Sequence, residues 1–88
     1  MPYRITSFES TPNPNALKCL VEPSPASVPR SYFKPEQAAG DPLAEALFAI
    51  EGVTNVLIHT TFITVCKRPD ARWPAIKKGV ERALDGAG

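Results

Sequence analysis

The segment Thr11-Pro12-Asn13-Pro14-Asn15 decides how the N-terminal part of the chain folds. Each proline fixes its own φ angle and favours an extended conformation of the residue before it. Each asparagine tolerates turn conformations and can bond to its own backbone. The segment therefore predicts a stiff, polar, exposed loop. Such a loop either only connects two strands or also presents a recognition surface, and the motif is compatible with both.

The residues on both sides of this loop have the composition of β-strands. Residues 3–9 are rich in β-branched and aromatic types, and residues 16–22 alternate so that Leu17, Cys19 and Val21 share one face. We expect the two segments to pair as a hairpin. Residues 23–40 contain several prolines and no sustained hydrophobic period, and they predict a long loop with a short extended piece at residues 31–33.

Asp41 followed by Pro42 predicts the start of a helix. The carboxylate can accept a first-turn N–H, and proline at the next position loses only a donor that would be unpaired there. We expect the helix over residues 42–50, ended by Gly52 in a left-handed conformation. Its apolar stripe consists of Leu43, Ala46, Leu47 and Ile50. Because capping explains Asp41, a catalytic role for this carboxylate is unnecessary.

Two further β-rich segments, residues 53–58 and 61–67, predict a second hairpin. Its residues on one shared face are expected to be Val56, Ile58, Ile63 and Val65. His59 lies at the turn of this hairpin. A base or a metal site needs a second positioned group, and none is near in the sequence, so we expect His59 to be an exposed polar residue.

The last predicted element is a helix over residues 71–84, with Asp70 as its cap and Trp73 as a core anchor. Its apolar stripe consists of Trp73, Ile76, Val80, Ala83 and Leu84. The order of elements is ββαββα. This order predicts an α+β fold, a two-layer sandwich in which two helices cover one face of an antiparallel sheet.

Size and composition indicate a single small soluble domain over residues 1–88. The chain has 43% hydrophobic and 22% charged residues and a net charge of +1, which give no reason to expect a nucleic-acid or membrane partner. We expect a cytoplasmic monomer. Residues 67–88 hold six basic and three acidic side chains. This local excess of positive charge either orients docking to an acidic partner or is an ordinary solvated helix face.

The chain offers little that indicates catalysis. Its two cysteines, Cys19 and Cys66, do not form a Cys-x-x-Cys pair, so neither a zinc site nor a redox dithiol is indicated. We expect both to be free thiols that pack as small hydrophobes in strands. There is no glycine-rich phosphate loop and no recognisable Ser/His/acid or Cys/His set. We therefore expect that the chain is not an enzyme.

Four blocks of sequence, taken together and in order, resemble the N-terminal domain of Nfu/NifU-like iron-sulfur scaffold proteins. They are residues 11–18, 41–53 and 62–67, and Trp73 before the last helix. In that family the cluster is held by a Cys-x-x-Cys motif in a separate C-terminal domain, and the chain is expected to stand alone without that domain. It departs from the family pattern at Cys19, where an aromatic residue is expected, and at Cys66, where threonine is expected.

The resemblance implies a non-enzymatic accessory or adaptor module associated with iron-sulfur cluster assembly or delivery. It would act through contacts with protein partners of that process and would hold no cofactor itself. The partner-binding residues would be Thr11, Pro12, Asn13, Pro14, Asn15 and Lys18. The alternative is direct binding of iron or an iron-sulfur cluster by Cys19 and Cys66 in a homodimer, which supplies four thiolates. A third possibility is a module that only promotes oligomerisation of another protein.

Overall fold

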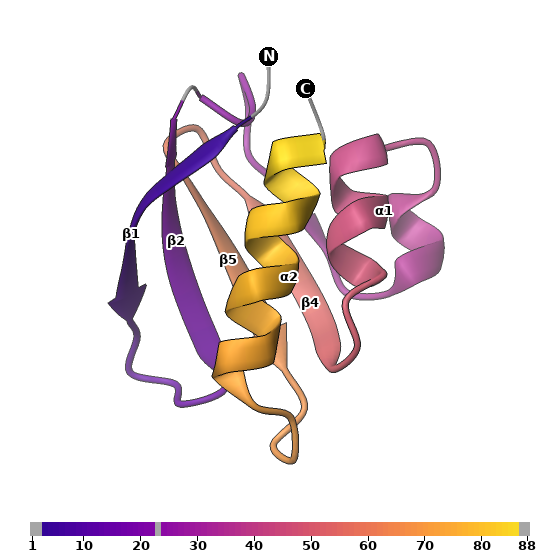
Figure 1. Ribbon diagram of the computed structural model, residues 1–88. Helices are drawn as coiled ribbons and strands as arrows, with labels where there is room; N and C mark the ends of the chain where they lie inside the picture. The colour runs from indigo at the N-terminus through magenta and orange to yellow at the C-terminus, as the bar shows by residue number, and fades with distance from the viewer. Residues whose placement is uncertain (1–2, 23, 87–88) are drawn as a thin grey trace.

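The computed structural model describes residues 3–22 and 24–86 (Figure 1). The strands are β1 (Arg4–Ser10), β2 (Ala16–Glu22), β3 (Arg30–Tyr32), β4 (Val53–Ile58) and β5 (Phe62–Lys67). The helices are η1 (Pro35–Ala38), which is a 3-10 helix, α1 (Pro42–Phe48) and α2 (Trp73–Gly86). The strands form one antiparallel sheet in the order β1-β2-β5-β4-β3, and α1 and α2 lie on the same face of it. The expected two-layer α+β sandwich is confirmed.

The alternation of side chains along the strands decides which face the helices cover. The core-facing residues of three strands, β2, β4 and β5, include seven that are buried: Leu17, Cys19, Val21, Val56, Ile58, Ile63 and Val65. The predicted faces of both hairpins are therefore confirmed. The residues between them point to the opposite face, on which no helix lies in the described part of the chain.

Helix α1 begins where the sequence predicted. The Asp41 carboxylate accepts a hydrogen bond from Ala44 N at 3.3 Å, and Gly52 adopts a φ of 96° after the helix. The helix ends at Phe48 and not at residue 50, because the chain tightens into a turn in which Ile50 N donates to Leu47 O. Its buried residues are Leu43, Ala44 and Leu47, whereas the predicted Ala46 and Ile50 are half-buried.

Helix α2 begins at Trp73, later than expected, and Asp70 does not cap it. Asp70 instead lies in the turn before the helix, with its Oδ1 atom 3.5 Å from Arg68 Nε. The buried residues of α2 are Ile76, Val80 and Leu84. A Cβ atom at Gly79 would lie 2.9 Å from the Cγ2 atom of Ile50, so this glycine lets α2 approach the turn after α1 closely.

Strand β3 was not predicted as a strand. The sequence predicted a short extended piece at residues 31–33 within a long loop, and the structure has a three-residue strand there, one residue earlier, that pairs with the outer edge of β4. The Tyr32 hydroxyl donates to Asp41 Oδ2 at 2.7 Å, and Arg30 Nε lies 2.9 Å from the same oxygen. The start of α1 thus holds β3 at the edge of the sheet.

Candidate functional site

The loop between β1 and β2 is stiffened by its own side chains. The Thr11 hydroxyl accepts from Asn13 N at 3.2 Å and lies 3.1 Å from Ala16 O. The Asn13 side-chain oxygen accepts from Asn15 N at 2.9 Å. These are the local bonds by which Thr and Asn stabilise turns. Pro12, Asn13 and Pro14 remain exposed, so the loop has the rigid, polar and exposed character that the sequence predicted.

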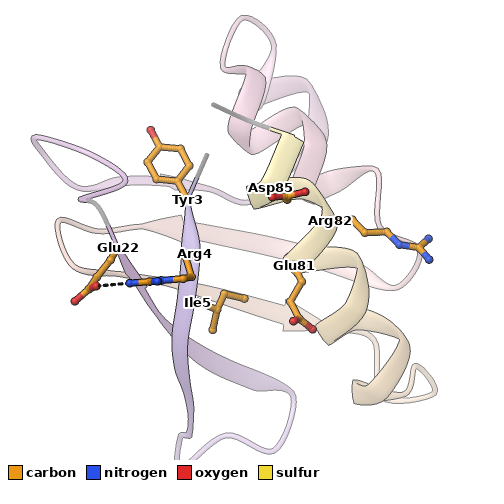
Figure 2. Close-up of a pocket in the computed structure, with 7 residues that line it drawn as sticks. All are labelled: Tyr3, Arg4, Ile5, Glu22, Glu81, Arg82 and Asp85. Atoms are coloured by element: carbon orange, nitrogen blue, oxygen red, sulfur yellow. Dashed lines mark hydrogen bonds and ion pairs between the residues drawn. The ribbon is translucent and has the colours of Figure 1, made fainter. Parts of the chain in front are cut away.

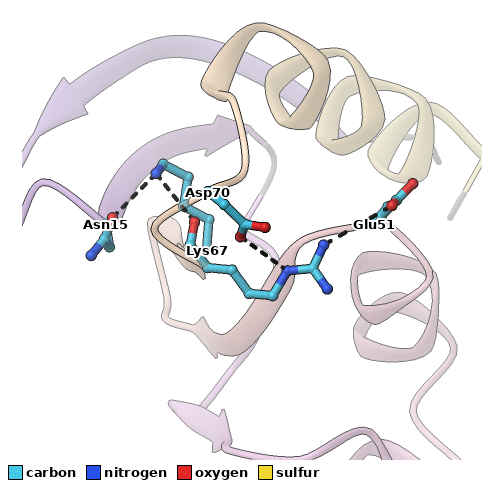
Figure 3. A network of polar contacts seen from close by, with 5 residues as sticks. Asn15, Glu51, Lys67 and Asp70 are labelled. Atoms are coloured by element: carbon cyan, nitrogen blue, oxygen red, sulfur yellow. Dashed lines mark hydrogen bonds and ion pairs between the residues drawn. The ribbon is translucent and has the colours of Figure 1, made fainter.

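Two residues from the β5–α2 region fix this loop to the body of the domain. The Trp73 indole Nε1 donates to Pro14 O at 3.1 Å. Lys67 Nζ donates to the Asn15 side-chain oxygen at 3.1 Å (Figure 3), and Lys67 N donates to Asn15 O at 2.8 Å. Lys67 Nζ also lies 5.5 Å from the centre of the Trp73 ring. Trp73 is half-buried at the edge of the core, and its bond to Pro14 O means that it also positions the loop.

A chain of charges continues from Lys67 toward the turn after α1 (Figure 3). Lys67 Nζ donates to Arg68 O, and the Arg68 guanidinium lies 3.5 Å from Asp70 Oδ1 and 4.0 Å from Glu51 Oε1. These carboxylate side chains are 80% and 94% exposed. Exposed pairs of this kind contribute little to stability, so the loop is held mainly by the bonds from Lys67 and Trp73.

Lys18 lies on the uncovered face of the sheet and is engaged there by two neighbours. Its Nζ atom is 3.7 Å from Glu9 Oε1 and 4.5 Å from the centre of the Phe62 ring. The Phe62 ring stacks on His59 with 4.7 Å between centroids. His59 also accepts a hydrogen bond from Thr60 N at its Nδ1 atom. It is half-buried, whereas the sequence predicted that it would be exposed.

The structure therefore gathers the predicted partner-binding residues on one continuous part of the surface. The loop leads directly into β2, and Lys18 follows on the uncovered face. Lys67 and Trp73, which hold the loop, were missed as site residues. Nothing local in the sequence reveals them, because Trp73 Nε1 and Pro14 O are 59 positions apart.

The two cysteines lie on opposite faces of the sheet. Cys19 is 0% exposed beneath the helices, and burial raises the pKa of its thiol to about 12. Cys66 is half-buried on the uncovered face, where burial also raises its pKa. The expectation of a core position is confirmed for Cys19 and wrong for Cys66. The alternation signalled this difference, since Cys66 directly follows the core residue Val65.

This separation bears on metal binding. Among residues 3–22 and 24–86, no group of three His, Cys, Asp or Glu side chains lies close enough together to hold a metal ion. The sulfurs of one chain have the sheet between them, and a thiolate at Cys19 would have to form inside an apolar core. In the same described ranges, no helix has the length and apolar character required to cross a membrane.

Comparison with known proteins connects this fold and loop to a family. Residues 5–87 match the family described as "Scaffold protein Nfu/NifU N terminal". The chain is 38% identical over 77 residues to NifU-like protein 5, mitochondrial, of Arabidopsis thaliana, a match that covers 82% of this chain and 26% of that protein. It is 39% identical over 74 residues to the NFU1 iron-sulfur cluster scaffold homolog, mitochondrial, of Drosophila willistoni, with the same coverage of 82% and 26%. The chain thus spans about a quarter of the length of these relatives.

Solved structures agree with the sequence relatives. The crystal structure of protein SAV1430 from Staphylococcus aureus superposes with a TM-score of 0.75 at 27% identity, covering 91% of this chain and 96% of that one. The solution structure of a NifU-like protein from Saccharomyces cerevisiae gives a TM-score of 0.73 at 25% identity, with 90% and 73% coverage. The chain belongs to the Nfu/NifU scaffold protein N-terminal family.

Proposed function

We propose that this chain is a non-enzymatic accessory module of iron-sulfur cluster assembly or delivery that acts through protein contacts. The observation that carries the proposal is the family match over residues 5–87. The assignment to iron-sulfur cluster assembly is also supported by a relative named as an iron-sulfur cluster scaffold homolog, which is 39% identical over the matched region. The module itself would hold no cofactor and would function as a monomer in the cytoplasm.

The β1–β2 loop is the best candidate for the contact surface. Binding of a partner costs little conformational entropy of the loop, because prolines and side-chain hydrogen bonds already fix its conformation. Pro12, Asn13 and Pro14 present the exposed tip, and Lys18 adds a positive charge on the adjoining sheet face. The loop is held by Trp73 and Lys67, so the tip has a defined orientation relative to the sheet.

The geometry does not favour the alternative in which Cys19 and Cys66 hold a cluster between two protomers. Cys66 could face a second copy from the uncovered side, but Cys19 could not reach the same site without opening the core. Anaerobic reconstitution with iron and sulfide tests this point. We expect no absorption that depends on Cys19, and a coloured protein that loses its colour in the Cys19→Ser variant would revive the alternative.

The contact surface can be tested with two matched amide-to-acid substitutions. Asn13→Asp adds one negative charge at the loop tip and keeps the oxygen that accepts from Asn15 N. Gln37→Glu adds the same charge on η1 and keeps the oxygen that accepts from Phe33 N. Affinity capture with the wild type is expected to recover proteins of cluster biogenesis. We expect Asn13→Asp to lose them and Gln37→Glu to retain them.

Two outcomes would contradict the proposal. One is the repeated capture of partners that have no part in cluster biogenesis. The other is equal capture by the wild type and the Asn13→Asp variant, which would exclude the loop tip from the contact. Size-exclusion chromatography and cell fractionation test the predicted monomer and the predicted location separately.

A further inference from the structure

A groove of about 910 Å³ lies between β1 and the C-terminal half of α2, away from the β1–β2 loop (Figure 2). Its apolar surface comes from Tyr3 and Ile5, which are half-buried and pack against the edge of the core. Tyr3 N donates to Leu84 O at 3.1 Å and joins the strand end to the helix. The groove thus has a fixed width, set by a backbone hydrogen bond between its two walls.

One wall of the groove is an open edge of the sheet. β1 pairs only with β2 within the part of the chain that the structure describes, so its outer backbone groups have no strand partner there. The register of β1 shifts between Ile5 and Ser7, and such a bulge interrupts regular pairing along an edge. The segment before the bulge is the part that borders the groove. A short extended peptide fits beside it better than a long strand.

The other wall is acidic. Glu81 and Asp85 lie one turn apart on α2, and neither has an ion-pair partner among the described residues. The basic side chains around the groove do not neutralise them. Arg4 lies 3.4 Å from Glu22, and the Arg82 guanidinium points away from β1 in Figure 2.

The position of these carboxylates on the helix adds to the negative potential. The last turn of α2 holds no basic residue, although the C-terminal end of a helix carries partial negative charge. Asp85 near this end is unfavourable for the helix itself. A local departure of this kind from helix preference is expected where a residue serves binding.

We infer that the groove binds an extended segment of another protein in which lysine or arginine recurs at every second position. These basic side chains would all face α2, so that their aliphatic stems cover Ile5 and Tyr3 and their charged ends reach Glu81 and Asp85. The backbone of the segment would pair with the outer edge of β1 near Ile5. This is a peptide-recognition mode in which backbone bonds supply affinity and alternate side chains supply specificity.

A second copy of this chain is a poor occupant by the same criteria. Its adjacent basic residues Lys77 and Lys78 lie within α2, where they cannot form an extended strand. Lys67 and Arg68, the other adjacent pair, are engaged at the loop and the turn. The strands of the described part hold basic residues only singly, at Arg4, Lys18, Arg30 and Lys67, so none of them presents two at alternate positions. The inferred partner is a different protein, and this inference is independent of the proposed function.

The test is an NMR titration of the isotope-labelled protein with a capped pentapeptide of alternating lysine and valine. Backbone amide shifts are expected to change at residues 3–5 and 81–85. The charge-removing variant is Glu81→Gln with Asp85→Asn. Its matched control, Glu51→Gln with Asp70→Asn, removes two carboxylates at the other end of the domain. We expect the first variant to bind about fivefold more weakly and the control to bind like the wild type.

A second peptide, with glutamate in place of lysine, separates charge from backbone pairing. It is expected not to bind the wild type and to bind a variant that carries Glu81→Lys and Asp85→Lys. The inference is overturned if the Glu81→Gln, Asp85→Asn variant and its control weaken binding of the lysine peptide equally, because the attraction would then depend only on the net charge of the protein. It is also overturned if the shifts spread over the uncovered sheet face and leave residues 3–5 and 81–85 unchanged.

Discussion

Adjacent residues of β5 lie in two different environments, one on each face of the sheet. Ile63 and Val65 are 0% exposed beneath the helices, whereas Phe62, Thr64 and Cys66 are half-buried on the face that no described helix covers. The same strand therefore contributes both to the core and to a solvent-facing surface. Stability is expected to depend mainly on the covered face, which leaves the other face and its adjoining loop free for contacts.

The largest effect should separate Ile63 from its neighbour Phe62. Ile63→Ala removes fully buried atoms and leaves a cavity, and we expect a loss of about 3 kcal/mol in the free energy of unfolding. Phe62→Ala removes a half-buried ring from the uncovered face, and we expect about 1 kcal/mol. Urea unfolding measures both. Equal losses would mean that Phe62 is buried in solution and that the two faces do not differ as described.

The two thiols give the next comparison. Cys19→Ser places a hydroxyl in the apolar core without a partner, and we expect a loss of about 2 kcal/mol in the free energy of unfolding. Cys66→Ser should change this free energy by about 0.5 kcal/mol or less. In the native wild type, a thiol reagent should label Cys66 first. Labelling of Cys19 at the same rate would contradict its position under α1 and α2.

Burial of Cys19 also predicts a pH dependence of stability. The folded thiol has a pKa of about 12, raised from 9.0, so the unfolded state loses this proton first as the pH rises. The protonated Cys19 thiol therefore makes its full contribution to the free energy of unfolding below pH 9.0, and this contribution is lost progressively toward about pH 12. Unfolding curves of wild type and Cys19→Ala across this range isolate the effect. The wild type should lose stability more steeply, and parallel curves would contradict the prediction.

Trp73 connects the covered face to the loop, so a conservative change there should produce a smaller and local effect. Trp73→Phe removes the bond from Nε1 to Pro14 O, and we expect a loss of about 1 kcal/mol in the free energy of unfolding. Amide exchange at Asn15 and Ala16 should accelerate more than exchange in β4. A uniform acceleration would show that Trp73 acts only as a core residue.

The smallest effect is expected from the ion pair on the uncovered face. The Lys18 and Glu9 side chains are 36% and 51% exposed, and such pairs contribute less than about 1 kcal/mol. Lys18→Gln should therefore leave the free energy of unfolding almost unchanged. Any difference from the wild type should shrink in high salt, since salt screens exposed charges. A larger, salt-independent loss would indicate that packing of the lysine stem on Phe62 matters more than its charge.

Much of the fold could be predicted because the signals were local. Asp41 with Pro42 starts α1, and the alternation around Leu17 and Val65 fixes the buried face of each hairpin. The prediction that Asp70 caps the start of α2 was wrong, because the turn before the helix pairs the Asp70 carboxylate with Arg68. A cap and a turn use the same side-chain oxygen, and composition alone does not choose between them.

The sequence alone determined the order of the four longer strands and the two α-helices, the buried face of β2, β4, β5 and both α-helices, and the stiffness of residues 11–15, because these follow from periodicity and from backbone preferences over a few residues. Tertiary structure decided the rest. It placed β3 against the free edge of β4, bonded Trp73 to the β1–β2 loop and formed the groove between β1 and α2. Each of these depends on strand order and helix position, which bring residues distant in the sequence into contact, and no local pattern encodes such contacts.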